Sequence, residues 1–519
     1  MRKNKNISIF NDVLGPIMRG PSSSHTAGPY HIGLIARALL GEEPAAVSFV
    51  FDPQGSFGEV YSLQGSDLGF AAGVMGIELT ADQFPRILQL AGDRNVAIEF
   101  AVRPLKTADH PNAVDIHMTG RTGRTLNLSA SSIGGGAVVI QKIETWPVQI
   151  TGKSHVVLVE LESESVESVS RILSADGQLL REIKVLSDNH RTLLEAHRKS
   201  PLSDNNLDEI RSESGADKLW TAPPVFFVQT GASLFASAAE MVRLAEQRRC
   251  SAGRMALAYE SELLAISEEE IQAEILRRYD IMKSSAREGL RDDPPPMSLL
   301  RPSAAKIYRA EAAGKLAIGG LHTRAAARAL AVMHINSGQG IVCAAPTAGA
   351  SGTLPGVLLT LAEEKGLNRK QIARATLAAA AIGLVVANRA TFAAEVAGCQ
   401  VEIGVAGAMA AAAVVEYAAG SARQACDAAA IALQNTMGSI CDPVQALVEI
   451  PCHTRNAVAA ASAFVCADLI LGGYQNPIPL DETIDAMYAV GQMLPRELKC
   501  TALGGLSLAP SGLKIKKLK

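Results

Sequence analysis

The sequence lacks a strong excess of charge of either sign. Its 519 residues include 49 Lys and Arg against 52 Asp and Glu, and charged residues make up 19% of the chain. A dedicated nucleic-acid-binding protein would present a basic face. We therefore expect no nucleic-acid partner.

The sequence also lacks an uninterrupted apolar run of about 18 to 20 residues, the length that spans a bilayer. The longest candidates, residues 375–387 and 404–415, are rich in alanine and typical of buried helices. No signal-peptide pattern is visible at the start. We expect a soluble, cytoplasmic protein without a membrane partner.

Cysteine is absent from the first 249 residues, and seven of the eight cysteines follow residue 340. Because disulfides are rare in large cytosolic proteins, thiols gathered in one part of the chain indicate metal binding or catalysis. Cysteine can also serve as a small buried apolar residue. That is our interpretation of Cys426 and Cys466, which lie in Ala-rich helical stretches.

Composition changes twice along the chain, which predicts a multidomain α+β protein. Residues 1–150 alternate apolar runs with Gly, Ser and Pro turns and predict an α/β domain. Residues 231–519 are Ala-rich and predict an all-α catalytic domain with amphipathic helices. In the first domain we predict strands at 47–51, 96–101 and 114–118, and helices at 32–40 and 84–90.

Residues 151–230 carry a strand–helix–strand pattern at 155–161, 166–173 and 182–186. A weaker second repeat follows, and its last strand is predicted at 224–229. The pattern resembles a degenerate ACT regulatory domain with βαβ units. A plain α/β spacer is the alternative.

Three cysteines lie beside helix-breaking residues: Cys399 follows a glycine, Cys441 precedes Asp-Pro, and Cys452 follows a proline. Each thiol could therefore point from a loop toward a shared centre. Thiolates are the ligands of iron–sulfur clusters, and three on a four-iron cluster would leave one iron open as a Lewis acid. The spacing differs from ferredoxin motifs, and a zinc site that includes His453 is the alternative by ligand type.

Long ordered motifs surround these cysteines, at residues 397–404, 441–444, 448–452 and 455–457, with further ones at 345–349, 354–356 and 504–506. They resemble the catalytic domain of iron–sulfur L-serine dehydratases. Residues 20–29, 55–57, 109–112 and 132–136 resemble the N-terminal domain of the same family. The domain order is that of the two-subunit form of the family fused into one chain.

The resemblance implies a [4Fe–4S] cluster on Cys399, Cys441 and Cys452, and no pyridoxal phosphate. It implies that L-serine, or a related 3-hydroxy amino acid, is converted to a 2-oxo acid (pyruvate for serine) and ammonia by β-elimination. It further implies a small amino-acid substrate and a homodimer.

The resemblance also assigns residues to the active site. His25 is the first choice for acid–base work or substrate binding, because imidazole titrates near neutral pH; Ser24 and Thr26 lie beside it. Predicted substrate-binding residues are Ser22, Ser23, Asn112, Thr347, Arg455 and Asn456. Arg455 and Asn456 could instead order the residues around the cluster. Simpler roles remain open: helix capping by the Ser/Thr run and by Asn456, and a turn at Asn112.

The sequence departs from the family pattern at Gln64, Phe392 and Cys500. Gln64 replaces an active-site histidine and cannot transfer protons at neutral pH, so an acid–base role would pass to His25. Two other functions therefore remain open. One is removal of sulfide from cysteine, and the other is a non-catalytic sensor whose ACT-like domain binds an amino acid.

Overall fold

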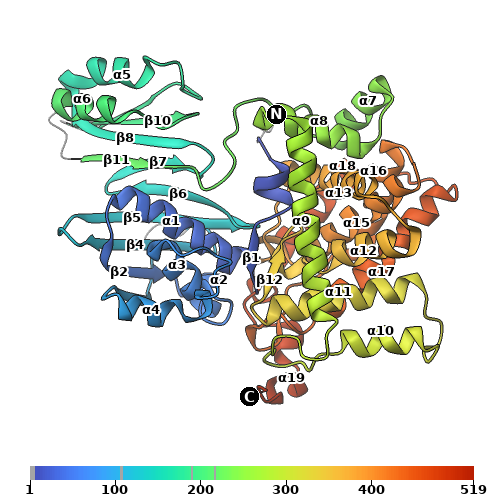
Figure 1. The fold of residues 1–519 in the computed structure, drawn as a ribbon. Helices are drawn as coiled ribbons and strands as arrows, with labels where there is room; N and C mark the ends of the chain where they lie inside the picture. The colour runs from blue at the N-terminus through green and yellow to red at the C-terminus, as the bar shows by residue number, and fades with distance from the viewer. Residues whose placement is uncertain (1–5, 106–108, 189–190, 215–217, 519) are drawn as a thin grey trace.

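The computed structural model describes residues 6–105, 109–188, 191–214 and 218–518, and it forms a mixed α/β, multidomain protein (Figure 1). The N-terminal lobe is built on a sheet with the strand order β3-β2-β4-β5-β6-β7. β2 and β3 are parallel, and the other neighbours are antiparallel. The strands are β2 (Pro44–Phe51), β3 (Ala97–Val102), β4 (Ala113–Gly120), β5 (Thr125–Gly134), β6 (Ala137–Ile143) and β7 (Trp146–Ile150).

The segments that precede two helices of this lobe contain polar residues of the candidate site. α1 (Gly28–Leu40) packs on α3 (Ser66–Met75). His25 lies in the short π-helix η2 (Ser23–Ala27) that precedes α1, and Gln64 lies in the turn that precedes α3. α2 (Ser56–Val60) and α4 (Ile87–Asp93) complete the set. The predicted strands at 47–51 and 114–118 and the helix at 32–40 are confirmed within slightly longer elements. The strand predicted at 96–101 is confirmed one residue later, and the helix predicted at 84–90 is a 3-10 turn (Phe84–Arg86) followed by α4.

The middle segment folds as β8 (His155–Glu162), α5 (Val166–Ser174), β9 (Lys184–Asp188), β10 (Arg191–Arg198), α6 (Asp204–Ser214) and β11 (Lys218–Ala222). Its sheet is antiparallel with the order β11-β8-β10-β9. The predicted strand at 224–229 is wrong, because the last strand ends at Ala222. Pro223 and Pro224 follow it, and proline has no N–H to donate to a ladder.

The C-terminal lobe is a helical bundle around α15 (Ile403–Tyr417), which contacts α12, α13, α16 and α17. Ala and Gly make up most of α15, so the surrounding helices can approach it closely. The other main helices are α7 (Ala238–Arg248), α8 (Ala252–Leu264), α9 (Glu268–Gly289), α10 (Ala304–Ala312), α11 (Leu321–Ser337), α12 (Thr353–Lys365), α13 (Arg369–Arg389), α16 (Ala422–Thr436), α17 (Cys452–Leu471) and α18 (Leu480–Met493).

Helices in this lobe are longer than the apolar runs in the sequence indicate. In the described part of the chain, three are long and apolar enough to cross a membrane by length and composition: 369–389, 399–417 and 452–471. The first two have 83% and 94% of their most apolar window buried inside the protein, and the third has 50%. The apolar side chains of the first two therefore form the core of the bundle.

A short antiparallel pairing joins the two lobes. β1 (Ile17–Arg19) pairs with β12 (Ile341–Cys343), and Ile17 lies opposite Cys343. In Figure 1 these strands lie between the α/β lobe and the helices. The segments that follow the two antiparallel strands leave from opposite ends of the pair, and they meet again through a direct contact: the Ala348 N–H donates to Ser23 Oγ at 3.3 Å. Residues 22–27 therefore lie next to residues 344–350.

The crossing of α1 and α3 gives a stability prediction. A Cβ atom at Gly73 would lie 2.3 Å from the Tyr30 carbonyl oxygen and 2.8 Å from the Cα atom of Gly33. Gly73→Ala should therefore overpack the crossing and destabilise the lobe by about 1–3 kcal/mol.

The matched control is Gly92→Ala in α4, where a Cβ atom would meet nothing within 4 Å. It should leave stability unchanged or raise it by up to about 1 kcal/mol. Thermal unfolding of both variants measures the difference. Equal melting temperatures would show that the α1–α3 contact does not limit stability.

Candidate metal centre and active site

Two of the three predicted thiol ligands lie together with a carboxylate that the sequence analysis did not assign. The ligand atoms of Cys399, Glu402 and Cys441 all lie within 4.8 Å of one another. Cys452, the first residue of α17, lies outside this tight group but close enough for its thiol to interact electrostatically with Cys399 and Glu402. All three cysteines are buried.

Local backbone geometry explains how Cys399 enters this centre. Cys399 follows α14 (Ala394–Ala397) and Gly398, whose φ is +78°. A Cβ atom at Gly398 would lie 2.6 Å from the Ser439 carbonyl oxygen, so only glycine allows this approach. The Ser439 segment leads directly to Cys441, and the two cysteines therefore meet.

The electrostatics of the thiols are unequal. A hydrogen bond from Cys441 and the charge of Arg455 lower the pKa of the Cys399 thiol, although burial opposes the shift. Hydrogen bonds with Cys399 and Cys500, together with burial, raise the pKa of Cys441, and burial and the charge of Cys399 raise the pKa of Cys452. Burial and the charge of Cys399 also raise the pKa of Glu402. Without a cation the centre therefore favours one thiolate over several, and a bound metal would reverse this.

Arg455 and Asn456 hold the frame of this centre. Arg455 donates to the Ile440 carbonyl at 2.8 Å and to Asp442 at 3.0 Å, one residue on either side of Cys441. The Asn456 amide accepts from Gly352 and Thr353 and donates to the Gly349 carbonyl, which fixes the 349–353 loop. Through these contacts Arg455 and Asn456 hold the segments that surround the thiols in place.

His25 of the N-terminal lobe is fully buried and is surrounded by the hydroxyl groups of Ser22, Ser24 and Ser56, which we call the hydroxyl wall. The Nε2 atom is hydrogen bonded to Ser56 Oγ at 2.9 Å, and the Nδ1 atom to Ser24 Oγ at 3.1 Å and Ser22 Oγ at 3.3 Å. Burial and the charge of His110 lower the pKa of His25 to about 3. The imidazole is therefore neutral at neutral pH, with both ring nitrogens engaged.

Other predicted residues connect this wall to the helical lobe. Thr26 donates to the Gln64 carbonyl at 2.8 Å, and Ser23 Oγ accepts from the Ala348 N–H at 3.3 Å. Thr347 accepts from the Ala350 N–H and is hydrogen bonded to Glu402. The structure thus brings the 22–27 loop and the thiol centre to one interface between the lobes.

Gln64 and Cys500, two positions where the sequence departs from the family pattern, contact each other. Gln64 Nε2 donates to the Ala446 carbonyl at 3.2 Å and approaches Cys500 Sγ at 3.5 Å. Cys500 is also hydrogen bonded through its thiol to Cys441, and its carbonyl accepts from Ser56 at 3.2 Å. Cys500 is therefore a fourth thiol, between the metal centre and the hydroxyl wall.

Asn112 faces a buried acid that the sequence analysis missed. Asn112 Nδ2 donates to Glu395 Oε1 at 2.6 Å, and Ser24 is also hydrogen bonded to this carboxyl group. Burial raises the pKa of Glu395 to about 7. Glu395 precedes Cys399 by four residues in the sequence, and this proximity to a predicted ligand was the available signal.

Two cavities are lined by residues that the sequence analysis singled out. One of about 380 Å³ lies between α15, α16 and α17 and is lined by Cys399 and Arg455. Another of about 450 Å³ lies between the lobes and is lined by His110, Gly134 and Phe392. The departure at Phe392 therefore shapes an inter-lobe cavity.

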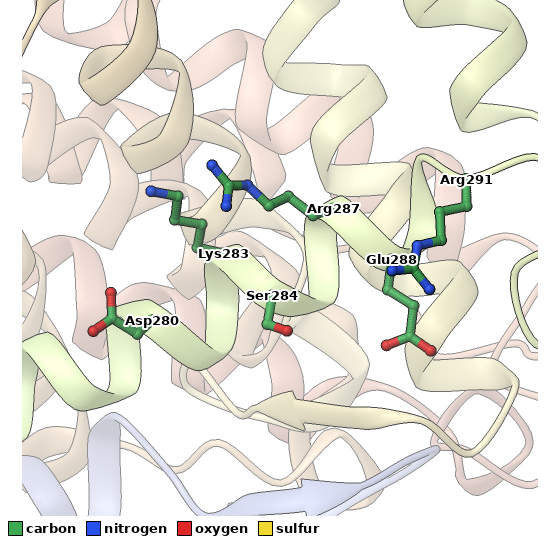
Figure 2. A pocket seen from close by; sticks show the side chains of 6 residues that line it. All are labelled: Asp280, Lys283, Ser284, Arg287, Glu288 and Arg291. Atoms are coloured by element: carbon green, nitrogen blue, oxygen red, sulfur yellow. The ribbon is translucent and has the colours of Figure 1, made fainter.

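A separate hollow of about 410 Å³ runs along α9 (Figure 2). Its lining mixes both signs of charge: Asp280, Lys283, Ser284, Arg287, Glu288 and Arg291. It contains none of the predicted site residues, and we assign it no role in the chemistry.

The thiol arrangement predicts the effect of removing each cysteine. Alanine at Cys399, Cys441 or Cys452 should reduce iron and sulfide in anaerobically reconstituted protein to a small fraction of the wild-type content, because each thiolate supplies a metal bond. Cys426→Ala, which removes a buried thiol from α16, should keep the full content. Elemental analysis decides: full iron content in any of the first three variants would remove that residue from the ligand set.

The helical lobe is similar to a known protein family. Residues 199–507 match the family model described as serine dehydratase alpha chain. The probable L-serine dehydratase alpha chain of Bacillus subtilis (strain 168) is 37% identical over 284 residues, which cover 55% of this chain and 95% of the relative. The L-serine dehydratase alpha chain of Peptoniphilus asaccharolyticus is 36% identical over 54% of this chain and 97% of the relative.

L-serine dehydratase TdcG of Escherichia coli (strain K12) is 33% identical over 53% of this chain and 62% of the relative. The family match covers more than half of the chain and contains all three predicted thiol ligands. This chain belongs to the serine dehydratase alpha chain family.

Proposed function

We propose that the protein is an L-serine dehydratase, a lyase that converts L-serine to pyruvate and ammonia. One observation carries the proposal: buried thiols of the helical lobe lie at an interface with a loop of hydroxyl groups from the other lobe. The relatives named L-serine dehydratase support the same reaction, at 33% to 37% identity for the three compared above. They do not favour desulfidase or sensor functions.

We further propose that Cys399, Cys441 and Cys452 hold a [4Fe–4S] cluster. The donor set fits, because it consists of soft thiolate sulfurs in a buried site. His453 is not part of the close ligand group among the described residues, and its Nε2 atom is hydrogen bonded to Ser337 at 2.9 Å, which disfavours the zinc alternative. When bound, such a cluster supplies a Lewis acid that assists the departure of hydroxide.

The reaction requires loss of the α-proton and cleavage of the β-carbon–oxygen bond, which leaves a carbon–carbon double bond. The resulting enamine tautomerises to an imine, and water hydrolyses it to the 2-oxo acid and ammonia. No net oxidation occurs, and the proposal requires no pyridoxal phosphate. The protein must orient the substrate, exclude bulk water and move the proton.

We assign these tasks to the inter-lobe wall. His25 holds the hydroxyl groups of Ser24 and Ser56 in place and exchanges protons with them as a neutral ring. Ser22, Ser23 and Thr347 bind the substrate carboxylate. Thr26 acts indirectly, because it fixes the loop of Gln64.

Three wider proposals are not needed for the chemistry. The βαββαβ order of the middle sheet is that of ferredoxin-like folds and supports an ACT-like regulatory domain. The N-terminal lobe corresponds to the second chain of the two-subunit relatives. We also propose a soluble homodimer in the cytoplasm.

The activity of the protein should depend on its bound iron. Anaerobically reconstituted protein should release equal amounts of pyruvate and ammonia from L-serine, and should lose this activity in air or with an iron chelator. Iron, sulfide and reductant should restore it, because a cluster with an open iron is oxygen-labile. Full activity after prolonged aeration and chelation would contradict a cluster-dependent reaction.

Turnover should also depend on His25. His25→Ala frees the hydroxyl groups of Ser24 and Ser56, and should lower kcat by about 100-fold or more with unchanged iron content. The control is His31→Ala, which removes another buried histidine of the same lobe, bonded to the Gly136 carbonyl at 2.8 Å. A wild-type kcat in the His25 variant would exclude it from proton transfer and hydroxyl positioning.

A further inference from the structure

Glu395 and Asn112 form a buried polar pair across the two lobes. Glu395 lies in α14, and Asn112 lies in the loop before β4. Their relative exposures are 4% and 0%, and the Nδ2-to-Oε1 distance is 2.6 Å. The sequence analysis predicted substrate binding for Asn112 without naming the group it binds, and it gave Glu395 no role, so the pair needs an explanation from its own geometry.

The backbone around Asn112 aims its side chain across the interface. The Asn112 N–H donates to His110 Nδ1 at 3.1 Å, and its carbonyl accepts from the Ser132 N–H at 3.2 Å. With the main chain engaged on both sides, the amide group is left to face Glu395. The conformation is therefore built into the lobe.

The pair has more acceptors than donors. Asn112 donates one of its two amide N–H groups to Glu395, and its Oδ1 atom has no hydrogen-bond partner in the described part of the chain. Glu395 accepts hydrogen bonds from its own backbone N–H, from Asn112 and from Ser24, and no Lys or Arg among the described residues forms an ion pair with it. A buried carboxylate without a cation is costly, and so is a buried acceptor without a donor.

A small cation with several N–H donors would satisfy both groups at once. A primary ammonium group has three donors and one positive charge, whereas a neutral hydroxyl group could not balance the carboxylate. The raised pKa of Glu395 agrees with a carboxyl group that lacks its counter-ion.

The surroundings connect this pair to the reaction site. Ser24 bridges Glu395 and His25, and Glu395 is close enough to Glu402 to raise the pKa of that group. The inter-lobe cavity is lined by His110 and Phe392, which precede Asn112 and Glu395 in the chain. The pair is therefore joined to His25 through Ser24 and lies near Glu402 of the thiol centre, and its neighbours in the chain line the inter-lobe cavity.

We propose that Glu395 and Asn112 Oδ1 bind the α-ammonium group of the substrate, and that this contact makes the site selective for 2-amino acids over 2-hydroxy acids. The inference rests on the proposed function, since it names the group that recognises the amino acid. Ser24 then touches both the ammonium subsite and His25. The substrate hydroxyl group is left to face the thiols.

The test compares two probes on anaerobically reconstituted holoenzyme: L-serine, and glycerate of the matching configuration, which carries a hydroxyl group in place of the ammonium. Because the holoenzyme would consume L-serine, serine binding is measured as the KM from initial rates of pyruvate release and glycerate binding as its inhibition constant, for the wild type, Glu395→Gln and Glu395→Asp. A protein that releases no pyruvate is titrated with both probes by calorimetry. In Glu395→Gln, L-serine should bind at least about 30-fold more weakly, and glycerate should change less than about three-fold. Glu395→Asp should recover part of the lost serine affinity, because it restores the charge.

A matched control separates this effect from a general loss of a buried acid. Glu416→Gln changes another buried glutamate, near the C-terminal end of α15, that accepts from Ser251 at 2.6 Å and from the Gly253 N–H at 3.1 Å. It should leave both constants unchanged. Iron content and melting temperature confirm that each variant is folded and loaded.

Two results would overturn the inference: equal weakening of serine and glycerate in Glu395→Gln, or a wild-type protein that prefers glycerate. Failure of the proposed function gives a different result. Wild-type protein that binds serine through Glu395 but releases no pyruvate would preserve the ammonium subsite and remove the dehydratase assignment.

Discussion

The site depends on main-chain hydrogen bonds that hold Cys441 against a segment far along the sequence. The Cys441 N–H donates to the Leu498 carbonyl at 2.9 Å, and the Cys500 N–H donates to the Cys441 carbonyl at 2.9 Å. Asp442 adds to these contacts between the two segments, because it accepts from the Leu506 N–H at 2.8 Å and forms an ion pair with Arg455. Gly505 has a φ of +63° and approaches Asp442 so closely that a Cβ atom would lie 2.5 Å from the carboxylate. The terminal glycine motif is therefore part of the metal centre.

The two lobes contribute different chemistry to one interface. The helical lobe provides thiols and the buried carboxyl groups of Glu395 and Glu402, whereas the N-terminal lobe provides hydroxyl groups, Asn112 and a neutral imidazole. The β1–β12 pairing and the Ser23–Ala348 contact align these halves. Neither lobe holds both the thiols and the hydroxyl groups, so the arrangement explains why both are needed for substrate binding in the proposed reaction.

The helices with a regular apolar pattern and the cysteines of the thiol centre could be predicted from the sequence. Apolar periodicity gave the helices of the bundle, and cysteine beside glycine or proline gave the thiol centre. The sequence analysis gave no role to Glu395, Glu402 or Ser56, although the last two lie inside the motifs at 397–404 and 55–57, because a single acid or serine has no periodicity and its burial depends on the other lobe. The false strand at 224–229 came from apolar residues whose preceding prolines prevent pairing. The contact between Gln64 and Cys500 was equally hidden, since 436 residues separate them.

The most direct test of the account is an anaerobic crystal of the reconstituted protein, measured with anomalous scattering at the iron absorption edge. The account predicts one compact iron peak enclosed by the sulfurs of Cys399, Cys441 and Cys452, on the side of the helical lobe that faces Ser24 and His25. An iron peak elsewhere, or a zinc signal that includes His453, would contradict the central claim.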